Sequence, residues 1–218
     1  YLSFAKKKWF QKIIIHTNGY NLADPEYLQL LYQAGLSWII LSIHGFGEIG
    51  DIITKKAGNF ENQNKALINI ARLIFSDNRF TLDTNTVLSK VWVPHVWKLY
   101  KYLTYFPIVR RMITYPYSLF WFTLEEKSSI VPDLQESIIQ IKKILDYTIQ
   151  VSISNTVIEA MPYCMFEEKY WKYILENHRT HKDIYLPKTQ WDFFHSEYYT
   201  QSNQHYTGWK IKYDFCKK

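Results

Sequence analysis

Three glycines in residues 42–51 have the spacing of a phosphate-binding loop. The stretch reads SIHGFGEIGD and places G-x-G-x-x-G at Gly45, Gly47 and Gly50, directly after the apolar run WIIL. Dinucleotide-binding folds use this pattern to bring their backbone close to a pyrophosphate. The fingerprint also needs a helix that opens at the last glycine, and an acidic residue at the end of the next strand, about 20 residues on.

The residues after Gly50 depart from the rest of that pattern. The predicted helix DIITKKAG is interrupted at Gly58, and about 20 residues past Gly50 the chain is still inside another helix, near Ile70. Asp83 lies in the following strand but is too distant. A loop that needs close backbone approach or positive φ is the favoured interpretation. A nucleotide (NAD)-dependent α/β enzyme stays as an alternative.

Polar side chains follow each of the short apolar runs that read as strands. In parallel sheets, chemistry collects at the carboxyl ends of the strands, so these residues are candidates for one shared site. They are Thr17, Asn18, Ser42, His44, Asn85, Tyr115, Tyr117 and Asn155.

The elements that must position these side chains alternate along the chain. Strands are predicted at residues 13–16, 38–42, 80–88, 108–115 and 149–154, and helices at 25–34, 60–75, 93–103 and 131–147. Asp24 is the expected N-cap of the first of these helices, with Pro25 in its first turn, and Pro132 is expected in the first turn of the last. Short buried strands joined by helices predict a parallel sheet with right-handed crossovers.

The composition is that of an ordinary globular protein, with 47% hydrophobic and 21% charged residues and a net charge of +6. The densest basic cluster, Lys6 to Lys8, reads as the solvated face of a helix, so no nucleic-acid partner is expected. No apolar run reaches the roughly 18 residues of a membrane span, and the start is not a signal peptide. Two cysteines, Cys164 and Cys216, are too few for a disulfide scaffold and fit a reducing cytoplasm.

A series of short motifs in a fixed order resembles the radical S-adenosylmethionine (radical SAM) superfamily. They are T-N-G at 17–19, A-G-L at 34–36, S-I-H-G at 42–45, G-N-F at 58–60, N-T-V at 85–87 and M-P-Y-C at 161–164. The likeness covers roughly residues 13–164. The last motif and the terminal D-F-C at Cys216 resemble the start of the cysteine-rich (SPASM-like) extension of some members, several of which modify peptides.

The resemblance implies a partial (β/α) barrel with parallel strands over residues 1–158, followed by an irregular C-terminal extension over 159–218 that reads as a shortened auxiliary-cluster region. In the family, a [4Fe–4S] cluster reduces S-adenosylmethionine, and the resulting radical abstracts hydrogen from a substrate. The family's C-x₃-C-x₂-C cluster motif is absent from this sequence. We therefore expect a fragment that is inactive by itself, whose cluster segment was lost, was trimmed or lies on another chain.

The resemblance also assigns candidate site residues. Thr17 and Ser42 stand where the family contacts S-adenosylmethionine, and Asn85 is placed to reach cofactor or substrate. The alternatives are a loop cap for each hydroxyl and a satisfied buried amide for Asn85. Cys164 and Cys216 become ligands of an auxiliary cluster, and the alternative for Cys164 is a buried structural thiol. A degenerate barrel that binds a partner without catalysis is the second hypothesis for the whole chain.

Overall fold

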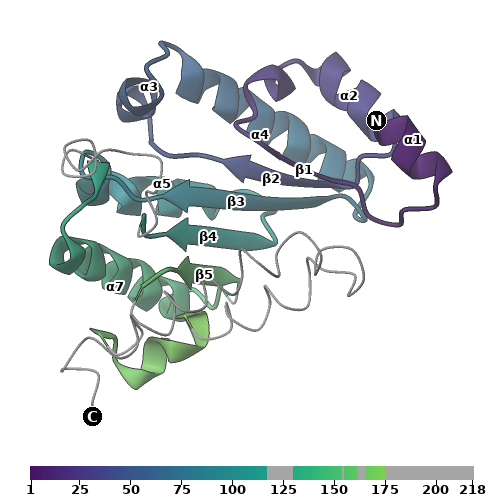
Figure 1. Ribbon diagram of the computed structural model, residues 1–218. Helices are drawn as coiled ribbons and strands as arrows, with labels where there is room; N and C mark the ends of the chain where they lie inside the picture. Colours follow the sequence, from purple (N-terminus) through teal and green to yellow (C-terminus); the bar gives the residue numbers. More distant parts are fainter. Residues whose placement is uncertain (117–129, 154, 162–164, 175–218) are drawn as a thin grey trace, which may run out of the picture. The chain divides into compact units, whose positions relative to one another are not determined.

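The computed structural model describes residues 1–116, 130–153, 155–161 and 165–174 (Figure 1). The chain divides into two compact units, Tyr1–Met161 and Pro162–Lys218. The sequence motifs had placed the boundary between residues 158 and 159. Every strand and long helix described below belongs to the first unit.

The first unit is built on a five-stranded sheet. Its strands are β1 (Ile14–Thr17), β2 (Trp38–Ser42), β3 (Thr81–Val87), β4 (Arg110–Thr114) and β5 (Thr156–Glu159). Each strand pairs in parallel with its neighbour in sequence, in the order β1-β2-β3-β4-β5. The predicted α/β class with a parallel sheet is therefore confirmed.

Four helices cover one face of this sheet: α2 (Pro25–Gln33), α4 (Asn59–Ser76), α5 (Val96–Leu103) and α7 (Leu134–Gln150) (Figure 1). Strands that follow one another in a single direction, joined by right-handed crossovers, place all helices on the same side. Ile39, Leu41 and Leu82 point to this face and are fully buried. A buried hydroxyl cluster of Tyr100, Thr148 and Thr156 joins α5 and α7 to β5 there.

The helix starts follow from local sequence. The carboxylate of Asp24 accepts the amide hydrogens of Glu26 and Tyr27, at 2.9 and 3.4 Å, which confirms it as the N-cap of α2. α7 begins at Leu134 with Asp133 as its N-cap, so Pro132 precedes the cap rather than lying in the first turn. The other short elements are α1 (Leu2–Lys7), η1 (Tyr20–Ala23), α3 (Glu48–Thr54), η2 (Val93–His95) and η4 (Glu168–Tyr170).

The predicted strand at residues 149–154 is wrong. α7 continues to Gln150, the chain turns at Ser152 with φ of 56°, and β5 starts only at Thr156. Ile141, Leu145 and Thr148 are buried at helical spacing, so packing extends the helix into a segment whose β-branched residues favour a strand.

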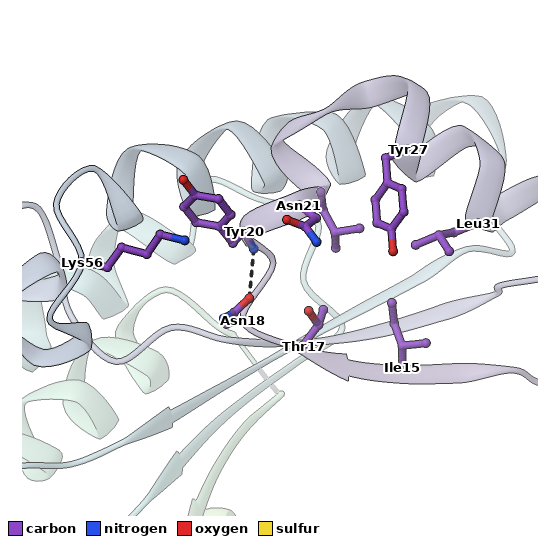
Figure 2. Close-up of a pocket in the computed structure, with 9 residues that line it drawn as sticks. Ile15, Thr17, Asn18, Tyr20, Asn21, Tyr27, Leu31 and Lys56 are labelled. Atoms are coloured by element: carbon purple, nitrogen blue, oxygen red, sulfur yellow. Dashed lines mark hydrogen bonds between the residues drawn. The ribbon is translucent and has the colours of Figure 1, made fainter.

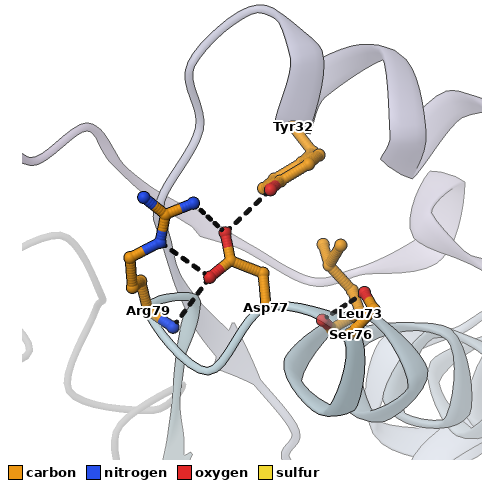
Figure 3. A network of polar contacts seen from close by, with 5 residues as sticks. All are labelled: Tyr32, Leu73, Ser76, Asp77 and Arg79. Carbon is orange, nitrogen blue, oxygen red and sulfur yellow. Dashed lines mark hydrogen bonds and ion pairs between the residues drawn. The ribbon is translucent and has the colours of Figure 1, made fainter.

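A polar network fixes the helix layer at the amino end of the sheet (Figure 3). Asp77 follows α4 and accepts a hydrogen bond from the Tyr32 hydroxyl of α2 at 2.7 Å. Its other carboxylate oxygen pairs with Arg79 Nε at 2.8 Å. The hydrogen bonds from Arg79 and Tyr32 hold the pKa of Asp77 well below its usual range. The network ties α2 to the turn between α4 and β3.

Little of the second unit lies within the described residues. η4 is surrounded by the buried aromatic side chains Phe166, Tyr170 and Tyr173, and the indole nitrogen of Trp171 donates to the Phe166 carbonyl at 2.9 Å. Cys164 and Cys216 lie outside the described residues. No helix in the described ranges combines the length and apolar character that crossing a membrane requires.

Candidate functional site

Each strand presents one polar side chain on the sheet face opposite the helices, toward its carboxyl end. The register pairs Ser42 with Asn85, and Thr114 with Glu159, and aligned residues of parallel strands point to the same face. His16 shares that face because it pairs with Ile40, two residues before Ser42. We call these five residues the polar row: His16, Ser42, Asn85, Thr114 and Glu159.

Hydrogen bonds connect the polar row in two groups. His16 Nε2 lies 2.8 Å from Ser42 Oγ. Thr114 Oγ1 lies 2.8 Å from Glu159 Oε2 and 3.2 Å from Asn85 Oδ1. A hydroxyl carries a single proton, so it cannot donate to both neighbours at once. The Thr114 hydroxyl donates its proton to Glu159, because that contact is shorter and its acceptor is a carboxylate. If the side-chain amide of Asn85 is rotated by 180°, its NH₂ group donates to the Thr114 oxygen.

The ends of β1 and β2 are held together by one buried side chain. Gln63 of α4 is 2% exposed, and its Nε2 donates to the carbonyl oxygens of Asn18 and Ser42, at 3.0 and 2.9 Å. An amide nitrogen has two protons, and both are used here. The position of Ser42 in the polar row is therefore set from the helix layer behind the sheet.

His44 fixes the loop after β2. Its Nδ1 accepts the backbone N–H of Val87 at 3.1 Å, so the ring proton of the neutral form is on Nε2. Burial lowers the pKa of His44, and the nearby His16 lowers it further. The lowered pKa favours the neutral form, and the hydrogen bond to Val87 makes His44 a structural part of the loop.

A buried ion pair lies below the polar row, toward the amino ends of the strands. Asp83 is fully buried, and its Oδ2 accepts from Arg110 Nη2 at 2.8 Å and from Arg110 Nε at 3.2 Å. The Arg110 guanidinium also lies 6.0 Å from the centre of the Trp38 ring. Burial raises the pKa of Asp83, and the positive charge of Arg110 opposes that shift.

The predicted site residues separate into two environments. Ser42 and Asn85 are direct neighbours on the open face. Thr17 pairs with Leu41, which is fully buried under the helices, so its side chain belongs to the other face. The Thr17 hydroxyl accepts the backbone N–H of Gly19 at 3.1 Å, the loop-capping arrangement considered as its alternative. The structure therefore does not bring Thr17 together with Ser42 and Asn85.

A small cavity of about 250 Å³ opens on the helix side of β1 (Figure 2). Ile15 and Thr17 form its floor, and Tyr27 and Leu31 of α2 form one wall. Asn18 also lines it, and its side-chain oxygen accepts the Tyr20 N–H at 3.1 Å, a hydrogen bond typical of a turn residue. This cavity and the polar row lie on opposite faces of the sheet.

Sequence reasoning missed His16, Thr114 and Glu159. His16 and Thr114 each stand next to a position that was considered, and Glu159 lies four residues after Asn155. The period of two along a strand decides which residues face the site. Asn155 was expected at a carboxyl end, but it precedes β5, where its carbonyl accepts the Arg111 N–H at 2.8 Å. The Tyr115 hydroxyl donates to the Pro132 carbonyl at 3.0 Å, and Tyr117 lies outside the described residues.

Two of the three glycines, Gly45 and Gly50, serve backbone packing, and Gly47 has a positive φ. A Cβ on Gly45 would lie 2.4 Å from Gly50 Cα, so these two residues touch through their main chains. Gly47 has φ of 60° and precedes α3, which has only seven residues. Asp51 in α3 binds the amides of Gly58 and Phe60, at 2.7 and 2.8 Å, and so caps α4. Among the strands that the structure describes, the order also contains no reversal of the kind at which doubly wound folds bind dinucleotides.

Within the described residues, no three His, Cys, Asp or Glu side chains are grouped so that they could hold a metal ion. No model of a known protein family matches the sequence, and no curated protein matches it. The likeness to radical SAM enzymes therefore stands on the sequence motifs alone.

Proposed function

We propose that this chain is the barrel part of a radical SAM enzyme and that its polar row binds S-adenosylmethionine. The sequential parallel sheet, with its helices on one face, supports this reading, because it is the arrangement of an open, partial (β/α) barrel. In such a barrel the face opposite the helices is the interior, and the carboxyl ends of the strands carry the site. The polar row has both properties.

The donor set of the polar row fits the polar groups of S-adenosylmethionine. The ribose diol needs hydrogen-bond acceptors and donors, which Asn85 and Ser42 supply. The sulfonium and the amino group are positively charged, and the carboxylate of Glu159 is the matching group on β5. When bound, S-adenosylmethionine supplies the adenosyl group for radical chemistry in this family. The residues of this chain would orient it along the row.

The residues do not fit the cluster that the family requires. Three thiolates hold it, whereas the chain has two cysteines, and neither lies among the described residues. We therefore assign no catalytic step to this chain. A non-catalytic barrel that binds a partner is the second candidate, favoured by the same cysteine count.

Calorimetric titration of the full chain with S-adenosylmethionine tests the proposal. Asn85→Ala and Ser42→Ala should each weaken binding about tenfold, the equivalent of one hydrogen bond. Thr81→Ala is the matched control, because Thr81 is on the same face at the amino end of β3 and should leave binding unchanged. No saturable binding by the wild type, or an equal loss in the control, would refute the assignment. The same titration separates the two candidates, since the non-catalytic barrel should bind a protein partner in a pull-down but no S-adenosylmethionine.

A further inference from the structure

Strand β1 forms an edge of the sheet. Among the described residues it pairs with β2 alone. The Ile13 carbonyl accepts the Ser37 and Trp38 amides, at 3.0 and 3.2 Å, and so points toward β2. Main-chain groups alternate in direction along a parallel strand, which places the N–H and C=O groups of Ile14 and His16 on the outer edge. These four groups can pair with one further extended strand.

The cavity described above lies beside this same edge. A residue paired with Ile15 from the outer side would point to the helix face, as Ile15 does, and so enter the space between Ile15, Tyr27 and Leu31 (Figure 2). At about 250 Å³ the cavity is smaller than the roughly 300–1,000 Å³ of typical small-molecule pockets. It has room for one large side chain.

The lysines near the edge favour an acidic partner. Residues 1–23 contain four lysines, at positions 6, 7, 8 and 12, and no acidic residue. Lys12 Nζ lies 5.5 Å from the centre of the Trp38 ring, on the face opposite the helices, and Lys56 lines the cavity on the helix face. A second copy of the chain would bring two such basic segments together, and their repulsion opposes self-pairing.

We propose that β1 is a docking edge for an acidic, extended peptide segment of another protein, which adds to the sheet as a sixth strand. One large apolar side chain of the peptide fills the cavity beside Ile15. Its alternate, acidic side chains lie on the other face, near Lys12. This inference goes beyond the proposed function and does not depend on S-adenosylmethionine binding.

Fluorescence anisotropy with a fluorescein-labelled peptide, Glu-Val-Glu-Phe-Glu-Val-Glu, tests the proposal on the full chain. We expect saturable binding of this peptide. A control peptide of the same composition, in which glutamate and apolar residues no longer alternate, should bind at least about tenfold more weakly. Ile14→Pro removes an outward N–H without touching the bonds to β2, and it should weaken binding by roughly tenfold. Leu31→Gln places an uncharged polar group against the apolar side chain of the peptide and should do the same, which keeps the test valid if the proline variant unfolds.

Charge is tested separately. Lys12→Glu should weaken peptide binding and reduce its salt dependence. Lys98→Glu, the same change at an exposed position of α5, should have no effect. Equal binding of the scrambled peptide, or wild-type affinity in both Ile14→Pro and Leu31→Gln, would overturn the proposal. So would a concentration-dependent dimer in sedimentation that Ile14→Pro abolishes, because β1 would then pair with a second copy.

Discussion

Replacing Arg110 by methionine should destabilise the protein strongly, because it leaves the carboxylate of Asp83 buried without its counter-charge. Asp83 is fully buried, and the Arg110 side chain is 14% exposed. Removing one partner of a buried ion pair typically costs about 3–5 kcal/mol, because it leaves an uncompensated buried charge. Oδ1 of Asp83 already has no hydrogen-bond partner among the described residues, so the variant carboxylate would have little left to bind.

Urea denaturation followed by tryptophan fluorescence measures this loss. If the free energy of unfolding falls by about 2 kcal/mol per molar urea, a loss of about 4 kcal/mol lowers the urea concentration at half-unfolding by about 2 M. Arg79→Met is the matched control. Arg79 pairs with Asp77 at the same distance, 2.8 Å, but its side chain is 84% exposed, so water screens the pair and a far smaller shift is expected.

The effect depends on pH in a defined direction. The folded pKa of Asp83 is raised above its unfolded value, so the folded state binds the proton more tightly. The contribution of Asp83 to the free energy of unfolding is therefore fully present below the unfolded pKa, near 4. It is lost as the pH rises through the folded pKa. Without Arg110 the folded pKa rises further, so Arg110→Met should cost less at pH 5 than at pH 7.

A double variant, Asp83→Leu with Arg110→Met, completes the test. It removes both charges and should recover most of the lost stability, because an apolar pair of similar volume leaves no buried charge. The reasoning is refuted if Arg110→Met costs no more than Arg79→Met, or if the double variant is less stable than the single one.

Three further predictions concern the loops at the carboxyl ends of the strands. Gly45→Ala should destabilise the fold by about 1–3 kcal/mol in urea denaturation, since its Cβ meets the Gly50 backbone. Gln63→Leu should cost about 2 kcal/mol in the same assay, because two partly buried carbonyls lose their donor. The pKa of His44 in an NMR titration should fall below 6.5, so its contribution to stability is present above that pH and is lost as the pH falls toward the folded pKa.

The sequence was informative where local chemistry decides structure. The N-cap at Asp24 and the strand at Trp38–Ser42 depend on residues close together in the chain, and both were predicted correctly. The strand at 149–154 was wrong because burial of the α7 face, a tertiary effect, outweighs the strand propensity of the β-branched residues there.

The candidate site was predictable only in part for a similar reason. Ser42 and Asn85 follow clear alternating or apolar strands, so their neighbourhood could be inferred. β1 reads Ile-Ile-His-Thr after Ile13, and a run of apolar residues does not reveal which alternate positions face the helices. Only the register with β2 shows that His16, rather than Thr17, lies beside Ser42.

The strictly sequential strand order has a consequence for how such a protein can change over evolution. Every pairing in the sheet joins consecutive strand–helix units, so a unit gained or removed at either edge leaves the central pairings of β2, β3 and β4 intact. Each unit also brings one side chain of the polar row. Recombination at the edges would therefore alter the binding surface by one functional group at a time, while the interior of the fold is inherited unchanged.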